Sequence, residues 1–176
     1  GLSLDSSTGA ISGTPTAVTS SATYTVTASN TGGSTTDDVT IVVNDIAPTI
    51  GYSQTSLALT KDTAMSDLSA TSTGGAVVSW SVSPSLPAGL SISSTTGIIS
   101  GTPTAVTSSA TYTVTATNTG GTDTVVLTIV VNDIVPSSLT YSPNSFTLTK
   151  GTAMTTVTPT ASGGAITSWS VSPSLP

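Results

Sequence analysis

Apolar and polar residues alternate along several short segments of this chain, as they do in strands that turn one face toward a core. Residues 111–116 show this most clearly, because Tyr112, Val114 and Ala116 are separated by threonines. Other alternating positions that we expect to point inward are Leu57, Leu59, Val78, Trp80, Val82, Leu127, Ile129 and Val131. No segment shows a helical period over a useful length, so the fold is predicted to be all-β.

Turn residues separate these strands. Glycine pairs at 74–75 and 120–121, and Thr96-Gly97, are typical of chain reversals. A further strand region is expected over residues 65–70, where Met, Leu and Ala are spaced among polar residues. About seven short strands with turn signals at short, regular intervals predict an antiparallel sandwich with Greek-key connections.

The chain repeats itself with a period of about 88 residues. Residues 13–28 recur without substitution at residues 101–116. The phase of the repeat predicts three parts: the second half of one repeat at 1–46, a complete repeat at 47–134, and the first half of another at 135–176. Tandem copies of one small domain favour a mechanical or display role over a single asymmetric active site.

Charge is scarce. Lys61 and Lys150 are the only cations, the net charge is -6, and His and Cys are absent. We therefore expect no nucleic-acid partner, since nothing could neutralise phosphates, and no binding to anionic membrane surfaces. No run is apolar enough for membrane insertion. Without His, Cys or Glu, acid–base and triad catalysis lack their parts, so we expect no enzyme.

Residues 109–118 resemble the penultimate strand of an immunoglobulin-type domain, with Val114 at the place of the usual Cys and Trp80 at the place of the core Trp. Residues 86–90 and 96–103 are similar to the Ig-like and cadherin-like repeats of large bacterial surface proteins. The resemblance implies tandem immunoglobulin-like (cadherin-like) antiparallel β-sandwiches with Greek-key connections. It also implies an extracellular or cell-surface location.

An Asn-Asp-Ile-x-Pro segment lies at each junction between repeats and resembles the calcium segment of cadherins. This resemblance makes Asn44, Asp45, Asn132 and Asp133 the candidate calcium ligands. Calcium takes about six to eight oxygens, and each junction offers a single Asp and no Glu. The alternative is a junction turn in which Asn and Asp satisfy backbone groups and Pro stiffens the linker.

Each copy of the repeat carries one lysine, Lys61 or Lys150, at equivalent positions. Some bacterial Ig-like domains form a Lys–Asn isopeptide cross-link beside a buried acid, and Asn132 and Asp133 would be the partners of Lys61. Lys61 lies in a polar turn, however, which favours the alternative of a solvated lysine that discourages pairing between sheet edges.

Two further groups of residues have alternative interpretations. Asp37-Asp38 could be part of a metal site, but valines replace both in the next copy, which favours a solvated turn. The aromatic residues that could form a sugar-stacking platform are Trp80, Trp169, Tyr52 and Tyr141. The tryptophans alternate in phase with valines, so we expect them to lie in the core.

Neither half-repeat can close a sandwich alone, because several large apolar side chains would stay exposed at about 1.5–3 kcal/mol each. The halves are complementary, so residues 135–176 of a neighbouring copy could complete residues 1–46, head to tail. The alternative is a window of a longer array. Both predict a stalk or fibre of stacked domains acting as a spacer. Other hypotheses are an adhesive module for a glycan or host receptor, and a calcium-rigidified adhesin.

Overall fold

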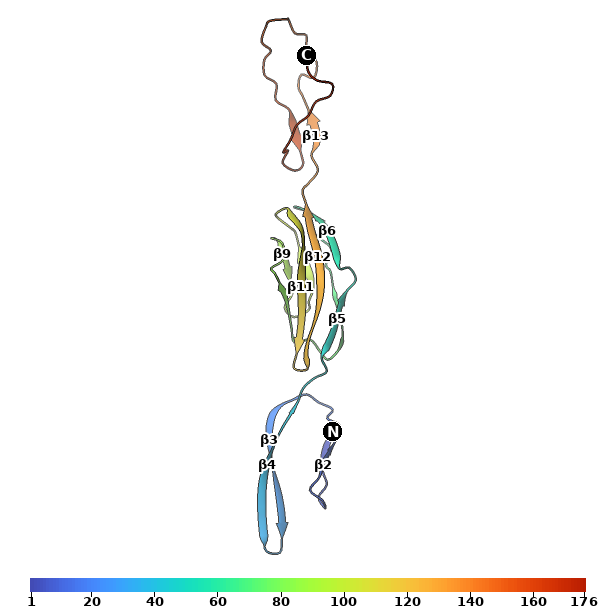
Figure 1. The fold of residues 1–176 in the computed structure, drawn as a ribbon, viewed down its shortest axis with the longest axis vertical. Coiled ribbons are helices and arrows are strands. Elements are labelled where there is room, and N and C mark those ends of the chain that lie inside the picture. The colour runs from blue at the N-terminus through green and yellow to red at the C-terminus, as the bar shows by residue number, and fades with distance from the viewer.

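The computed structural model describes residues 1–176 and consists of fourteen strands without a helix. No helix that could cross a membrane is therefore present. The chain is elongated, and the complete repeat, residues 47–134, lies between the two half-repeats (Figure 1). The half-repeats lie at opposite ends of this middle repeat (Figure 1).

Eight strands form the middle repeat. They are β5 (Pro48–Tyr52), β6 (Ser56–Thr60), β7 (Ala70–Gly74), β8 (Ser79–Ser83), β9 (Leu90–Ile92), β10 (Ile99–Gly101), β11 (Thr107–Asn118) and β12 (Gly121–Asn132). One sheet has the order β6-β12-β11-β8, and the β5-β7 and β9-β10 pairs contribute to the opposite face of the core. All pairs are antiparallel except β6 with β12, which are parallel. The all-β Ig-like sandwich predicted from the sequence is confirmed.

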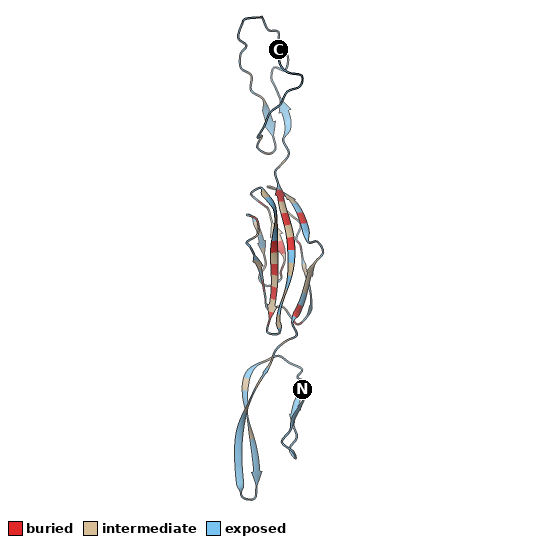
Figure 2. Ribbon diagram, in the orientation of Figure 1, coloured by how far each residue is buried: buried red, intermediate tan, exposed pale blue.

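The core of the middle repeat follows the alternation in the sequence. Tyr112, Val114 and Ala116 of β11 are buried, and Leu127, Ile129 and Val131 of the neighbouring strand β12 are fully buried beside them. All sixteen buried residues of the chain lie between Pro48 and Val131 (Figure 2). Only the middle repeat therefore has a closed core.

The half-repeats contain the same local pairs without a core. Residues 1–46 form β1 (Leu2–Leu4), β2 (Ile11–Gly13), β3 (Thr19–Asn30) and β4 (Gly33–Val43), and residues 135–176 form β13 (Ser137–Thr140) and β14 (Thr160–Ser162). The β3-β4 hairpin has the register of β11-β12, and Tyr24 pairs with Val39 as Tyr112 pairs with Leu127. Yet Tyr24 is 48% exposed whereas Tyr112 is 4% exposed, because no second sheet covers the hairpin.

Two local expectations from the sequence are wrong. Residues 65–69 form no continuous strand: Leu68 makes an isolated bridge to Ile99, and β7 begins only at Ala70. Val78 is 71% exposed, because β8 begins one residue later and the alternation does not extend beyond the strand. Val77 packs against the core instead.

Candidate functional site: the joint between repeats

The linker between β4 and β5 is held by the tip of the β11-β12 hairpin. Asn118, the last residue of β11, is 8% exposed. It is the one buried polar side chain at this end of the repeat. Its Nδ2 donates to the carbonyl oxygen of Ile46 at 2.7 Å. Its Oδ1 accepts the N–H groups of Gly120 at 2.8 Å and Gly121 at 3.1 Å. One amide therefore fixes the hairpin turn and the linker together.

Asp45 supplies a second contact at the same place. Its backbone N–H donates to the hydroxyl of Thr119 at 3.0 Å. Its carboxylate Oδ1 accepts the N–H of Ile46 at 2.8 Å. The aspartate thus shapes the linker locally, while the main chain on either side of it is tied to the hairpin tip.

Two glycines let the linker approach the repeat closely. A Cβ atom on Gly120 would overlap the carbonyl oxygen of Asp45, and one on Gly75 would overlap the carbonyl oxygen of Ile46. Gly74, in turn, has a positive φ of 82° and faces the carbonyl oxygen of Ala47. The linker therefore lies in a slot that only glycine backbone leaves open.

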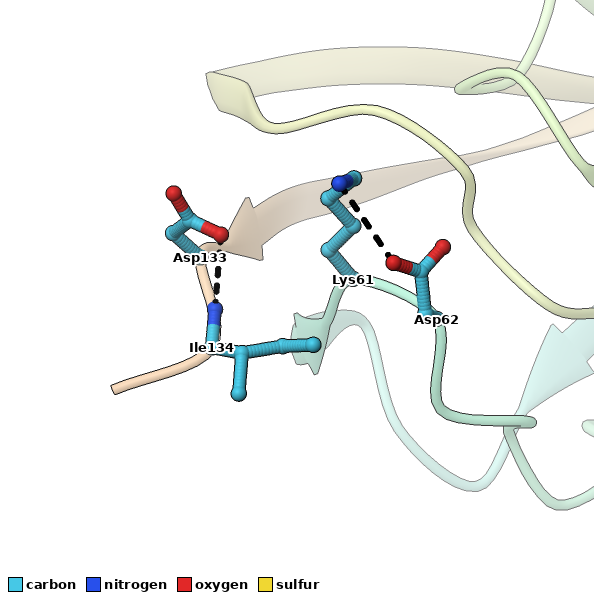
Figure 3. A network of polar contacts seen from close by, with 4 residues as sticks. All are labelled: Lys61, Asp62, Asp133 and Ile134. Carbon is cyan, nitrogen blue, oxygen red and sulfur yellow. Dashed lines mark hydrogen bonds and ion pairs between the residues drawn. The ribbon is translucent and has the colours of Figure 1, made fainter. Parts of the chain in front are cut away.

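The second junction repeats part of this arrangement. The carboxylate of Asp133 accepts the N–H of Ile134 at 2.8 Å (Figure 3). The N–H of Gly164 donates to the carbonyl oxygen of Ile134 at 3.0 Å, and a Cβ on Gly164 would overlap that oxygen. Gly163-Gly164 is thus the counterpart of Gly74-Gly75, although no β11-β12 type tip follows within residues 135–176.

We define the joint as the linker residues 44–48 together with the Asn118–Gly121 tip and the Gly74-Gly75 pair. Sequence reasoning placed Asn44 and Asp45 at the junction but missed Asn118, Gly75 and Gly120. The recurrence of the Asn-Thr-Gly-Gly tip at residues 30–33 could have indicated Asn118 and Gly120, and the recurrence of a glycine pair at residues 163–164 could have indicated Gly75.

The calcium candidates occupy this joint as single carboxylates. Asp45 and Asp133 each engage the backbone N–H that follows them, and Asn44 and Asn132 are exposed. No group of three His, Cys, Asp or Glu side chains comes together in the chain. The arrangement supplies few of the oxygens that calcium takes, and calcium binding here stays a prediction.

Lys61 pairs with its own neighbour. Its Nζ lies 3.4 Å from Oδ2 of Asp62 (Figure 3). Both side chains are partly exposed, at 35% and 52%, so the pair contributes little to stability. Asp62 and Asp133 are exposed, and the isopeptide chemistry would need a buried acid.

The aromatic residues of the middle repeat are structural. Trp80 is 6% exposed and covers Gly97, where any Cβ would overlap its ring. The hydroxyl of half-buried Tyr52 donates to the carbonyl oxygen of Gly97, and burial raises the pKa of Tyr52 to about 12. In the half-repeat, by contrast, Trp169 is 56% exposed. The prediction of a core tryptophan is therefore confirmed for Trp80, whereas Trp169 is exposed in this structure.

Asp37 and Asp38 lie in the β4 strand and not in a turn. The carboxylate of Asp38 accepts the hydroxyl of Thr25 at 2.7 Å on the outer face. Asp37 pairs with Val26, which is the register position of half-buried Val125 in the middle repeat. The two neighbouring aspartates thus occupy opposite faces of the sheet.

The fold and the joint define a protein of tandem Ig-like domains. Residues 1–44 and 40–132 match the family described as "Putative Ig domain", and the chain belongs to this family. The two matches overlap at residues 40–44, where β4 ends and the linker begins. No curated protein matches the chain.

Solved structures with similarity to the chain include other multidomain proteins. A "putative alpha-galactosidase" from Bacteroides fragilis is 29% identical with a TM-score of 0.42; the match covers 54% of this chain and 20% of that one. A chimeric titin Z1Z2 is 22% identical with a TM-score of 0.37, covering 52% and 98%. The protocadherin GammaB4 extracellular domain is 15% identical with a TM-score of 0.33, covering 73% and 27%. The chain thus spans about one fifth of the length of the first of these.

Proposed function

We propose that this chain is a structural spacer of an extracellular bacterial surface protein, stalk or fibre, in which Ig-like repeats are stacked end to end. Ig-like and cadherin-like domains are typical of extracellular proteins. The observation that carries the proposal is the joint. Asn118 binds the carbonyl oxygen of Ile46 in the linker, so the middle repeat fixes the direction of the segment that leads into it. A spacer needs this property, because loosely linked domains would not define a length.

The path of the chain through the middle repeat also supports the proposal. The chain enters near β5 and leaves from β12 at the opposite end (Figure 1). Tension along the molecule would pull β6 and β12 in opposite directions along their length, because these two strands are parallel and paired from Ser56–Thr60 to Thr128–Asn132. Their hydrogen bonds would then be loaded together in shear and not broken one after another.

We propose a mechanical function for this chain and no catalytic activity. The few ionisable side chains are dispersed, and the buried aromatic and polar groups are used in packing and in the joint. The nearly uncharged threonine faces suit side-by-side packing without repulsion that depends on salt.

The spacing is tested by distance measurements between equivalent exposed sites on neighbouring repeats. The chain has no cysteine, so Thr36→Cys and Thr124→Cys provide two unique spin-label positions, one on β4 and one on β12. A single narrow distance distribution is expected. A broad distribution would show a flexible linker and would reject the spacer.

The response to tension is tested by single-molecule pulling through introduced cysteines. Pulling through Thr49→Cys and Asn132→Cys shears β6 from β12. The matched control uses Ser108→Cys and Asn132→Cys, which separates the β11-β12 hairpin from its open end. The shear geometry is expected to need the higher unfolding force, and an equal or lower force would contradict a load-carrying role.

A further inference from the structure

Asp123, which lies outside the joint defined above, is the one aspartate of the middle repeat whose side chain bonds to a distant part of the chain. Its carboxylate Oδ2 accepts the N–H of Ile50 at 2.8 Å, 73 positions away. On β12 it stands in register with buried Ala116, so its side chain leaves the sheet on the face that carries the core. A carboxylate on this face is costly unless it is hydrogen-bonded, and the N–H of Ile50 supplies that bond.

The strand that Asp123 holds lies at an edge. β5 is paired with β7 alone. On its other side Pro48 has no N–H to donate, and the N–H of Ile50 is the one that Asp123 takes. The side chains of Ile50 and Tyr52 pack against the core. Asp123 therefore adds to this apolar packing the hydrogen bond that joins β5 to the four-stranded sheet.

Asp123 and Asn118 belong to the same hairpin and hold the same segment at two points. Asn118 ends β11 and binds the carbonyl oxygen of Ile46, whereas Asp123 near the start of β12 binds the N–H of Ile50. Buried Pro48 lies between the two anchored residues. A single hydrogen bond fixes a point, about which the segment can still swing. Two bonded points separated by four residues, which is at most roughly 13 Å of extended chain, also fix its direction.

The two copies of the hairpin differ at this second point. The Asn-Thr-Gly-Gly tip is the same at residues 30–33 and 118–121. Thr35, however, occupies the register position of Asp123, because it pairs with Ala28 as Asp123 pairs with Ala116. The hydroxyl oxygen of a threonine is bound directly to Cβ, one bond nearer to the backbone than a carboxylate oxygen of aspartate. A threonine at position 123 would therefore stop short of the N–H that Asp123 reaches.

We propose that position 123 determines how firmly a repeat holds the segment that enters it. Asp123 and Asn118 form a two-point clamp on residues 46–50, and a threonine at the equivalent position leaves the single anchor at the tip. The proposal rests on the spacer function and deepens it, because the stiffness of each joint becomes a property of one position in the repeat. Asp123 is thus a positioning residue that acts on the direction of the entering strand.

The first experiment replaces Asp123 by Thr in the full-length chain, which installs the residue of the preceding copy. Amide hydrogen exchange measured by NMR reports directly on the Ile50 N–H. Its exchange is expected to become roughly tenfold faster, because the hydrogen bond to a charged group is lost and β5 opens locally. The amide of Ile129, a fully buried core residue of β12, is the internal reference and is expected to change much less.

The ratio of the two exchange rates separates positioning from general stability. Equal acceleration at Ile50 and Ile129 would mean that Asp123 only stabilises the repeat as a whole, and it would overturn the clamp. Unchanged exchange at Ile50 would overturn it as well.

Two further variants separate the acceptor from the charge. Asp123→Asn keeps an oxygen at the same reach but makes a weaker, neutral hydrogen bond, so the exchange rate of Ile50 is expected to lie between those of the unchanged chain and Asp123→Thr. Asp67→Thr removes the charge of an exposed aspartate between β6 and β7 and is expected to leave Ile50 unaffected. Equal rates in Asp123→Asn and Asp123→Thr, or an effect of Asp67→Thr as large as that of Asp123→Thr, would contradict the proposal.

The direction of the joint is measured with spin labels away from the substitution. Thr36→Cys and Ser81→Cys are exposed positions on β4 and β8. The distance distribution between them is expected to be broader with Asp123→Thr than with Asp123 and to narrow again with Asp123→Asn. A width that does not respond to Asp123→Thr would overturn the clamp while a narrow distribution leaves the spacer function intact. A broad distribution in the unchanged chain would instead reject the spacer, so the two proposals fail separately.

Discussion

Asn118 of the middle repeat donates its side-chain Nδ2 to the carbonyl oxygen of Ile46, at 2.7 Å and 72 positions away along the chain. The linker is therefore bound by the repeat that it introduces and does not hang freely between two domains. The same asparagine completes the hairpin turn through Gly120 and Gly121. The hairpin turn and the direction of the linker thus share one side chain as partner.

Replacing Asn118 by Ala should destabilise the middle repeat. The substitution removes the common partner of the Gly120 and Gly121 N–H groups and of the Ile46 carbonyl, and each lost hydrogen bond costs about 0.5–1.5 kcal/mol. Chemical denaturation at low protein concentration measures this loss. Asn30→Ala is the matched control, because the equivalent tip holds no linker, and it should leave the unfolding of the middle repeat unchanged. Similar losses for both variants would count against the joint.

Replacing Gly120 by Ala should loosen the joint. The added Cβ overlaps the carbonyl oxygen of Asp45, so the linker must move away from the hairpin. At the equivalent Gly32, a Cβ would meet only Asn30 Oδ1, at 3.2 Å, and Gly32→Ala serves as the control. We expect the distance distribution between labels at residues 36 and 124 to broaden for the first variant alone. Distance distributions of unchanged width for both variants would show that the close approach of Gly120 to Asp45 does not restrict the linker.

A core substitution in the middle repeat should lower the unfolding free energy far more than the equivalent substitution in a half-repeat. Leu127 is fully buried, so Leu127→Ala should cost about 2–5 kcal/mol of unfolding free energy. Val39 is its register equivalent in β4, and Val39→Ala should change the main unfolding transition little in dilute solution. Thermal unfolding followed by circular dichroism distinguishes the two. A large loss for Val39→Ala would mean that the first half-repeat unfolds together with the middle repeat.

Alkaline pH should destabilise the middle repeat through Tyr52. Burial raises its pKa from 10.0 to about 12, so the unfolded chain releases the phenolic proton first as the pH rises. The contribution to stability is complete below pH 10 and is lost as the pH approaches and passes about 12. Tyr52→Phe loses the hydrogen bond to Gly97, at about 1 kcal/mol near neutral pH, but lacks this pH dependence. Denaturation midpoints that fall in parallel for both proteins would contradict the assignment.

Removal of calcium should leave stability unchanged. Each junction presents one aspartate whose carboxylate already accepts a backbone N–H, and about six to eight oxygens are the usual requirement. We expect equal melting temperatures with added calcium and with a chelator. A higher melting temperature in calcium that disappears in Asp45→Asn would instead establish the cadherin-like site.

Much of the fold could be predicted because the order of apolar and polar residues within a strand indicates which of its faces is buried. The alternation at Tyr112, Val114 and Ala116 identifies the inward face whatever the partner strand is. The same pattern could not predict that Val78 lies outside β8 or that Leu68 makes only a single bridge to Ile99, since both depend on where neighbouring strands end.

The sequence by itself determined the repeat, its phase and the apolar face of each strand, because these follow from the order of residue types along the chain. Tertiary structure alone decided that Asn118 meets Ile46 and that Gly75 and Gly120 leave room for the linker. It also decided that Trp80 is buried while Trp169 is exposed. The physical reason is that alternation states which side of a strand is apolar, whereas burial and joint contacts require a particular partner brought from a distant part of the chain.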